Sequence, residues 1–152
     1  MNTLNRKIMN IFFRYLIMIL AAISGFWIFY FVFTPLTVYP VYFLFNIFFD
    51  AVLYKTTILI SHEFPIQLVK ACIAGSAYYL LFILNLSTPG IKIKKRIKMI
   101  LYSFAALLII NILRIVLLGS MFVNGSPLFN ITHKAFWYFG NIIFIIAIWF
   151  IE

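Results

Sequence analysis

The feature that most constrains this chain is the apolar segment Met99 to Val123, which contains a single charged residue, Arg114. At about 1.5 Å per residue, a helix of this length crosses the roughly 30 Å hydrocarbon core of a bilayer. Three more segments are apolar and uncharged: Tyr15 to Phe33, Ala71 to Leu86 and Ala135 to Ile151. Because 66% of the 152 residues are hydrophobic, one soluble core cannot bury them all. We therefore predict an all-α polytopic membrane protein, a single domain over residues 1–152 with about four transmembrane helices.

The basic residues predict the orientation of these helices. Twelve Lys and Arg residues accompany only three acidic ones, and five of the basic residues lie between Lys92 and Lys98. Basic residues in short loops mark the cytoplasmic side, where they interact with anionic headgroups. Arg6 and Lys7 likewise favour a cytoplasmic N-terminus, so the first helix exits at Pro35 and the residues up to about Lys70 lie outside. The predicted location is the cell membrane, with several passes.

Several classes of function and processing are disfavoured by the same sequence. The basic residues are not interleaved with aromatic ones, and no RNA-binding signature is present, so we expect no nucleic-acid partner. The chain has one cysteine and no spaced set of metal ligands, so we expect no disulfide, metal or cofactor. Ala22-Ile23-Ser24 resembles a signal-peptide cleavage site, but the segment stays apolar well beyond it, which favours a retained helix.

The region between the first two helices combines an apolar segment with an alternating one. Val41 to Leu53 is short for a span and contains Asn46 and Asp50. We predict an interfacial or re-entrant helix on the outer side. The alternative is a fifth span with an extracytoplasmic N-terminus. Thr56 to Lys70 alternates on both sides of His62-Glu63-Phe64-Pro65, which predicts a short extracytoplasmic β-hairpin with His62 in its turn.

Three residues with reactive or charged side chains are placed by this topology at the same outer membrane level, on three different helices. Each has a structural explanation when taken alone: Cys72 as a small buried hydrophobe, Arg114 as a snorkelling anchor and His133 as an interfacial residue. However, anchoring residues normally flank a span, whereas apolar residues still follow Arg114, namely Leu117, Leu118, Met121 and Phe122. Their common level predicts a catalytic site in which Cys72 is the nucleophile, His133 the general acid/base and Arg114 the oxyanion or thiolate stabiliser.

Three further residues are predicted to support this site. Asn111 lies one turn below Arg114 on the same helix face. Gly75 and Ser76 follow Cys72 on the face that also includes Tyr79, and small residues there let another helix approach closely.

At these residues the sequence resembles the exosortase/archaeosortase family of membrane transpeptidases. The resemblance rests on ACIAGSAYYLLF around Cys72, NILRIVLLG around Arg114 and THKAFWYFG around His133. It extends over Leu36 to Phe150, and the order Cys, Arg, His matches the family's proposed triad. The chain is shorter than most members and is similar to the minimal archaeal ones. Ile73-Ala74-Gly75 follow the cysteine, where many members have Ser or Thr and then Gly.

The resemblance implies a membrane-embedded cysteine transpeptidase or protease with its site at the extracytoplasmic face. Its substrates would be membrane-anchored exported proteins with a C-terminal motif, a transmembrane helix and a basic tail. Cleavage through a thioester on Cys72 would be followed by transfer of the new C-terminus to an acceptor, in some members a lipid. A substrate helix packed beside Gly75 and Ser76 would bring its motif to Cys72. The alternative is a non-enzymatic membrane protein, such as an assembly factor or transporter subunit.

Overall fold

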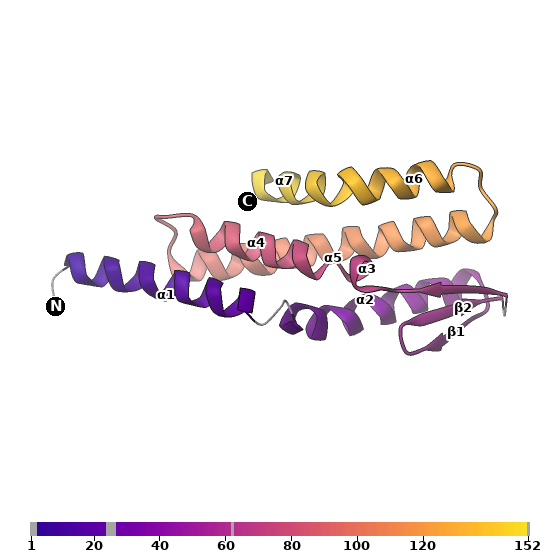
Figure 1. Ribbon diagram of the computed structural model, residues 1–152, viewed down its shortest axis with the longest axis horizontal. Coiled ribbons are helices and arrows are strands. Elements are labelled where there is room, and N and C mark those ends of the chain that lie inside the picture. Colours follow the sequence, from indigo (N-terminus) through magenta and orange to yellow (C-terminus); the bar gives the residue numbers. More distant parts are fainter. Residues whose placement is uncertain (1–2, 24–26, 62, 152) are drawn as a thin grey trace.

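The computed structural model describes residues 3–23, 27–61 and 63–151, which form an elongated bundle of helices with a small sheet at one end (Figure 1). The helices are α1 (Thr3–Ile23), α2 (Trp27–Phe48), α3 (Lys70–Ile73), α4 (Gly75–Ser87), α5 (Ile93–Val123), α6 (Phe129–Ala135) and α7 (Asn141–Ile151), and the π-helix η1 (Phe136–Gly140) joins the last two. The strands are β1 (Ala51–Tyr54), β2 (Thr57–Ile60) and β3 (Phe64–Gln67). The α5–α6 connection lies at the sheet end, and the α4–α5 connection and both termini lie toward the other end (Figure 1).

Three segments of the described chain are long and apolar enough to cross a membrane: α2, the combined α3–α4 segment Lys70–Ser87, and α5. The segment formed by α6, η1 and α7 is bent by 50° at its break and provides a fourth span if its two parts are counted together. The apolar part of α1, Ile8–Ile23, is shorter than a span. By length and composition these helices are compatible with a helical membrane protein, and a count of four spans depends on the bent C-terminal segment.

The predicted first helix, Tyr15 to Phe33, is wrong in its boundaries. The structure divides this segment between α1 and α2, with residues 24–26 outside the described part. We expected the helix to end at Pro35, because proline lacks the N–H donor that a helix needs. Instead, α2 continues through Pro35 and Pro40 to its end at Phe48. Membrane helices tolerate proline because neighbouring helices and hydroxyl side chains compensate for the missing hydrogen bond.

The predicted interfacial helix over Val41 to Leu53 is also wrong. Its first part continues α2, and its last residues belong to β1. Val41 and Phe45 are fully buried, because α2 packs against both β1 and α5. Part of the segment that we assigned to the membrane interface therefore lies in the core, whereas Phe43, Ile47 and Phe48 stay exposed.

A β-hairpin is present and gains a third strand, but its second strand begins at Phe64, inside the predicted turn, and ends at Gln67 rather than Lys70. β2 pairs with β3 in the antiparallel register that sets Thr57 opposite Gln67, and β1 pairs with the other side of β2. Each strand has four residues. His62 lies outside the described residues. Since β3 is followed directly by α3, the sheet fixes the direction in which the chain enters the helix that carries Cys72.

The predicted helix Ala71 to Leu86 is interrupted at Ala74. This residue has φ +60° and ψ +35°, the left-handed conformation, and it ends α3 and precedes α4. A non-glycine residue pays a steric cost in this region, and such residues are concentrated at functional sites. The consequence is local: Cys72 lies on a separate single turn rather than on the first turn of a continuous helix.

The central part of the bundle is held together by aromatic side chains from α2, α4 and α5. Phe33 stacks on Tyr78 with ring centroids 3.6 Å apart, and the ring of Phe104 meets both edge-on at 5.4 and 5.5 Å. Phe29 extends the cluster toward Phe82 and Phe104. Aromatic pairs in this geometry contribute about 0.5–1.5 kcal/mol each beyond the area that they bury. The cluster fixes the positions of α4, which follows the turn that contains Cys72, and of α5, which contains Arg114.

Two arginines close the end of α4 that is remote from the sheet. Arg14 donates hydrogen bonds from Nε to the carbonyl oxygen of Leu86 at 2.7 Å and from Nη2 to that of Thr88 at 3.1 Å. Arg96 donates to the carbonyl oxygens of Asn85 and Thr88. These carbonyls lack helical partners, and cations are favoured at a helix C-terminus. Arg96, which we assigned to a solvated headgroup anchor, is instead 4% exposed and joins α5 to α4.

Substitution of Gly119 tests the packing of α5 against α2. A Cβ atom there would lie 2.4 Å from Cζ of Phe45 and 3.1 Å from Cδ1 of Ile66. Gly119→Val is therefore expected to lower the free energy of unfolding in mixed micelles by about 1–3 kcal/mol. Leu117→Val, on the exposed face of the same helix, is the matched control and should change it little. Equal stability of the two variants would show that Gly119 is not a tight contact.

Candidate functional site

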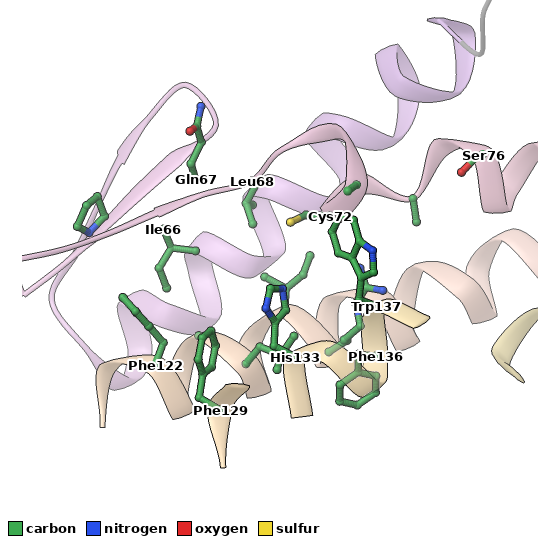
Figure 2. Close-up of a pocket in the computed structure, with 17 residues that line it drawn as sticks. Ile66, Gln67, Leu68, Cys72, Ser76, Phe122, Phe129, His133, Phe136 and Trp137 are labelled. Atoms are coloured by element: carbon green, nitrogen blue, oxygen red, sulfur yellow. The ribbon is translucent and has the colours of Figure 1, made fainter. Parts of the chain in front are cut away.

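A cavity of about 370 Å³ lies between β3, α3, α5 and the segment of α6 and η1. Figure 2 shows that the sulfur of Cys72 and the imidazole of His133 approach it from different elements. Arg114 lines the same cavity from α5. Cys72 and Arg114 are 42 positions apart in the sequence, and Arg114 and His133 are 19 positions apart. All three nevertheless line one cavity. The predicted triad residues are therefore brought together.

Cys72 is half-buried and is held by its backbone on both sides. Its N–H donates to the carbonyl oxygen of Val69 at 2.8 Å, and its carbonyl oxygen accepts a hydrogen bond from Nδ2 of Asn111 at 2.7 Å. The left-handed conformation of Ala74 turns the chain away immediately afterwards. These constraints fix the Cα–Cβ bond of Cys72, so that its thiol is presented at the cavity wall.

Arg114 supplies the positive charge of the site. It is partly buried within α5 and interacts electrostatically with Cys72 and with Tyr78. Tyr78 is fully buried, and its ring is fixed in the aromatic cluster described above. A guanidinium in a low-dielectric cavity stabilises a thiolate or a developing oxyanion more strongly than it would in water.

His133 enters the cavity from α6, which packs against α5 and has no buried residue. Its ring stacks on Phe129 at 5.5 Å and meets Trp137 edge-on at 6.3 Å. We expected His133 to open the last transmembrane helix, whereas it lies near the end of α6, before the π-helix. Among the described residues no hydrogen bond joins it to Cys72. Hydrogen bonds of catalytic groups are often long or absent before substrate binds.

Asn111 connects the two helices that carry Cys72 and Arg114. It lies one turn before Arg114 on α5 and is 3% exposed. Its hydrogen bond to the Cys72 carbonyl reaches 39 residues along the sequence. Asn111, which we predicted to support the site from the same helix face as Arg114, thus contacts the backbone of Cys72 directly.

Asn111→Ala is expected to lower the free energy of unfolding by about 1–3 kcal/mol, because it leaves the buried carbonyl of Cys72 without its donor. Asn124→Ala is the matched control. Its amide also donates to a backbone carbonyl, that of Ser120 at 2.8 Å, but this bond is local and exposed. The control should lose much less stability in the same mixed-micelle titration. An equal loss in both variants would argue against a role for Asn111 in holding α3.

The two small residues after Cys72 have different environments, contrary to the shared face that we predicted. Gly75 is buried against α2, where a Cβ would lie 2.7 Å from the ring of Tyr30. Nζ of Lys70 lies 5.6 Å from the centroid of the same ring. Ser76 is exposed and lines the cavity. The close helix approach predicted at Gly75 is thus made by α2 of the same chain, which leaves no room there for a substrate helix.

Two parts of the cavity wall were not identified from the sequence. One is β3 with the following residue, since Pro65 to Leu68 all line the cavity. The other is the aromatic face of the C-terminal segment, formed by Phe129, Phe136 and Trp137. The spacing of these aromatics around His133 follows one face of a helix, and this regularity was the available signal.

The described residues contain no group of three or more His, Cys, Asp and Glu side chains that would bind a metal ion. The chemistry available at the cavity is that of a thiol, an imidazole and a guanidinium. Comparisons with protein-family models, with curated proteins and with solved structures gave no match, so the functional assignment depends on the geometry of this site and on the resemblance of its motifs.

Proposed function

We propose that the protein is a membrane-embedded cysteine transpeptidase or protease of the exosortase/archaeosortase type. The observation that carries this proposal is the cavity shared by Cys72, Arg114 and His133. Their three elements are distant in the sequence, and an anchor arginine, a packing cysteine and an interfacial histidine would not need to meet. A nucleophile, a base and a cationic stabiliser around one space are the components of acyl transfer.

In the proposed reaction, the Cys72 thiolate attacks the carbonyl carbon of a peptide bond. Arg114 stabilises the negative charge that develops on the carbonyl oxygen. The C–N bond then breaks, His133 gives a proton to the leaving amine, and the acyl group remains on sulfur as a thioester. An acceptor amine, hydroxyl or water attacks the thioester while His133 takes its proton, which transfers the new C-terminus and restores the thiolate.

The proposed substrates are membrane-anchored exported proteins whose C-terminus carries a short motif, a transmembrane helix and a basic tail. The proposed orientation puts the sheet and the cavity on the extracytoplasmic side and the basic α4–α5 connection on the cytoplasmic side. The position of the cavity near the sheet end supports this arrangement. The substrate helix would lie beside the bundle at a place other than Gly75, which α2 covers.

Labelling of Cys72 in intact cells with the impermeant anionic reagent sulfonatoethyl methanethiosulfonate tests this proposal. The half-buried thiol of Cys72 faces the cavity beside Arg114 and should react readily from the outside. The matched control moves the cysteine to Ala77, a buried position in α4 outside the cavity, in a Cys72→Ala background. If Cys72 is labelled no faster than the cysteine at 77, the non-enzymatic alternative is favoured.

A further inference from the structure

Among the described strands, β3 has a free edge, and this edge borders the cavity that Cys72 lines. The sheet order β1-β2-β3 leaves β3 outermost, and Pro65, Ile66, Gln67 and Leu68 all line the cavity. Successive side chains of a strand point to opposite faces. A cavity that touches four consecutive residues therefore runs along the edge of the strand rather than over one of its faces.

The hydrogen-bond pattern shows which backbone groups point to that edge. The N–H of Leu68 donates to the carbonyl oxygen of Thr56 at 2.8 Å, in line with the antiparallel register of β2 and β3. Bonded and non-bonded pairs alternate in such a ladder. Ile66 is therefore bonded to β2, whereas the N–H and carbonyl groups of Gln67 point away from it, toward the cavity.

Pro65 occupies the other edge-facing position of β3. Proline has no N–H to offer, and within sheets it is found on edges of this kind. The edge thus presents the carbonyl of Pro65 and both backbone groups of Gln67 beside mostly apolar walls. Pro65 and Gln67 are exposed, so these backbone groups are open to a ligand, and an extended peptide has the donors and acceptors that match them.

We propose that the segment of the substrate ahead of the scissile bond binds as a fourth strand along the free edge of β3. This inference rests on the proposed function, because it concerns the same cavity and the same nucleophile. β3 leads directly into α3, and Gln67 precedes Cys72 by only five positions (Figure 2). A peptide that runs in the direction of β3 brings its carbonyl end to Cys72. Its alternate side chains meet apolar residues such as Ile66, Phe122 and Trp137.

Peptidyl chloromethyl ketones test this binding mode without knowledge of the natural sequence, since strand pairing uses the main chain. The thiolate of Cys72 displaces chloride from either reagent and forms a thioether. N-acetyl-tetra-alanyl chloromethyl ketone is long enough to pair with Gln67, whereas N-acetyl-alanyl chloromethyl ketone is not. The longer reagent is expected to alkylate Cys72 of the purified full chain about tenfold faster, as a few main-chain hydrogen bonds would provide.

Two independent changes should remove this advantage. N-methylation of alternate amides in the tetra-alanyl reagent prevents pairing and leaves the protein untouched. Gln67→Pro removes the edge N–H, and Leu53→Pro is its matched control. The N–H of Ser61 donates to the carbonyl oxygen of Asp50, which fixes the pairs of β1 and β2 that are hydrogen-bonded. By alternation, the backbone N–H of Leu53 points away from β2, to the opposite edge of the sheet. N-methylation and Gln67→Pro should each bring the ratio of the alkylation rates of the longer and shorter reagents close to one. Leu53→Pro should leave that ratio unchanged.

The outcomes separate this inference from the function on which it rests. Equal rates for the two reagents, or an advantage that survives both N-methylation and Gln67→Pro, would overturn the strand pairing alone. A Cys72 that resists both reagents would contradict the proposed function and the pairing with it. If Gln67→Pro instead separates a dimer into monomers and leaves the rate ratio unchanged, the edge pairs with a second copy and the proposal is wrong.

Discussion

Replacement of Cys72 by alanine is expected to abolish processing of exported proteins, with a fall in rate of about 10⁴-fold or more. Loss of a catalytic nucleophile has effects of this size because no neighbouring group can form the covalent intermediate. The measurement is a quantitative comparison of C-terminal peptides from the host's membrane fraction. In Cys72→Ala cells, substrates should keep the helix and basic tail that wild-type cells remove.

Ser87→Ala provides the control for this change. Ser87 is exposed in the last turn of α4 and lies outside the cavity. Cells with this variant should process substrates at a rate close to that of the wild type. Unimpaired processing in Cys72→Ala cells would exclude a thioester mechanism at this residue.

Arg114→Gln is expected to reduce processing by about 10²–10³-fold, since one preorganised donor to an oxyanion is worth this much. Arg114→Lys keeps the charge but loses the planar pair of donors, so its activity should be intermediate. A second readout separates catalysis from folding. Neutral iodoacetamide should alkylate Cys72 more slowly in Arg114→Gln than in the wild type, because the guanidinium that stabilises negative charge on the sulfur is absent.

The corresponding control is Arg96→Gln at the other end of α5. Arg96 holds the C-terminus of α4, far from the cavity, so its loss should affect stability and leave the alkylation of Cys72 in the folded protein unchanged. If Arg114→Gln lowers stability alone, with normal alkylation and processing per folded molecule, Arg114 is an anchor and not part of the site.

The sequence was most informative where composition and charge dominate. The apolar runs predicted α5 and the C-terminal helical segment, and the alternation after Lys55 predicted the β2–β3 hairpin. Span lengths and the position of the basic loop predicted a common level for Cys72, Arg114 and His133, and in the structure these three residues line one cavity. These predictions needed only helix rise, bilayer thickness and charge asymmetry.

Other features were not accessible because they depend on tertiary contacts. Pro35 and Pro40 are ordinary stop signals, yet α2 continues through them within the bundle. Nothing in the sequence marks Ala74 for a left-handed conformation, so the break after Cys72 could not be foreseen. The burial of Arg96 and the packing of Gly75 on Tyr30 likewise depend on which helices meet.

The most direct test of the account is the detection of an acyl group on Cys72. Acid quenching of host cells that are processing natural substrates should trap the thioester on the wild-type enzyme, because it stops transfer to the acceptor. Mass spectrometry of the purified protein should then find an adduct on the peptide that contains Cys72, and neutral hydroxylamine should remove it. The account predicts this labile adduct in the wild type and a smaller amount of it in His133→Ala, because His133 also protonates the leaving amine when the thioester forms. Continued processing by a protein whose Cys72 never carries an acyl group would contradict it.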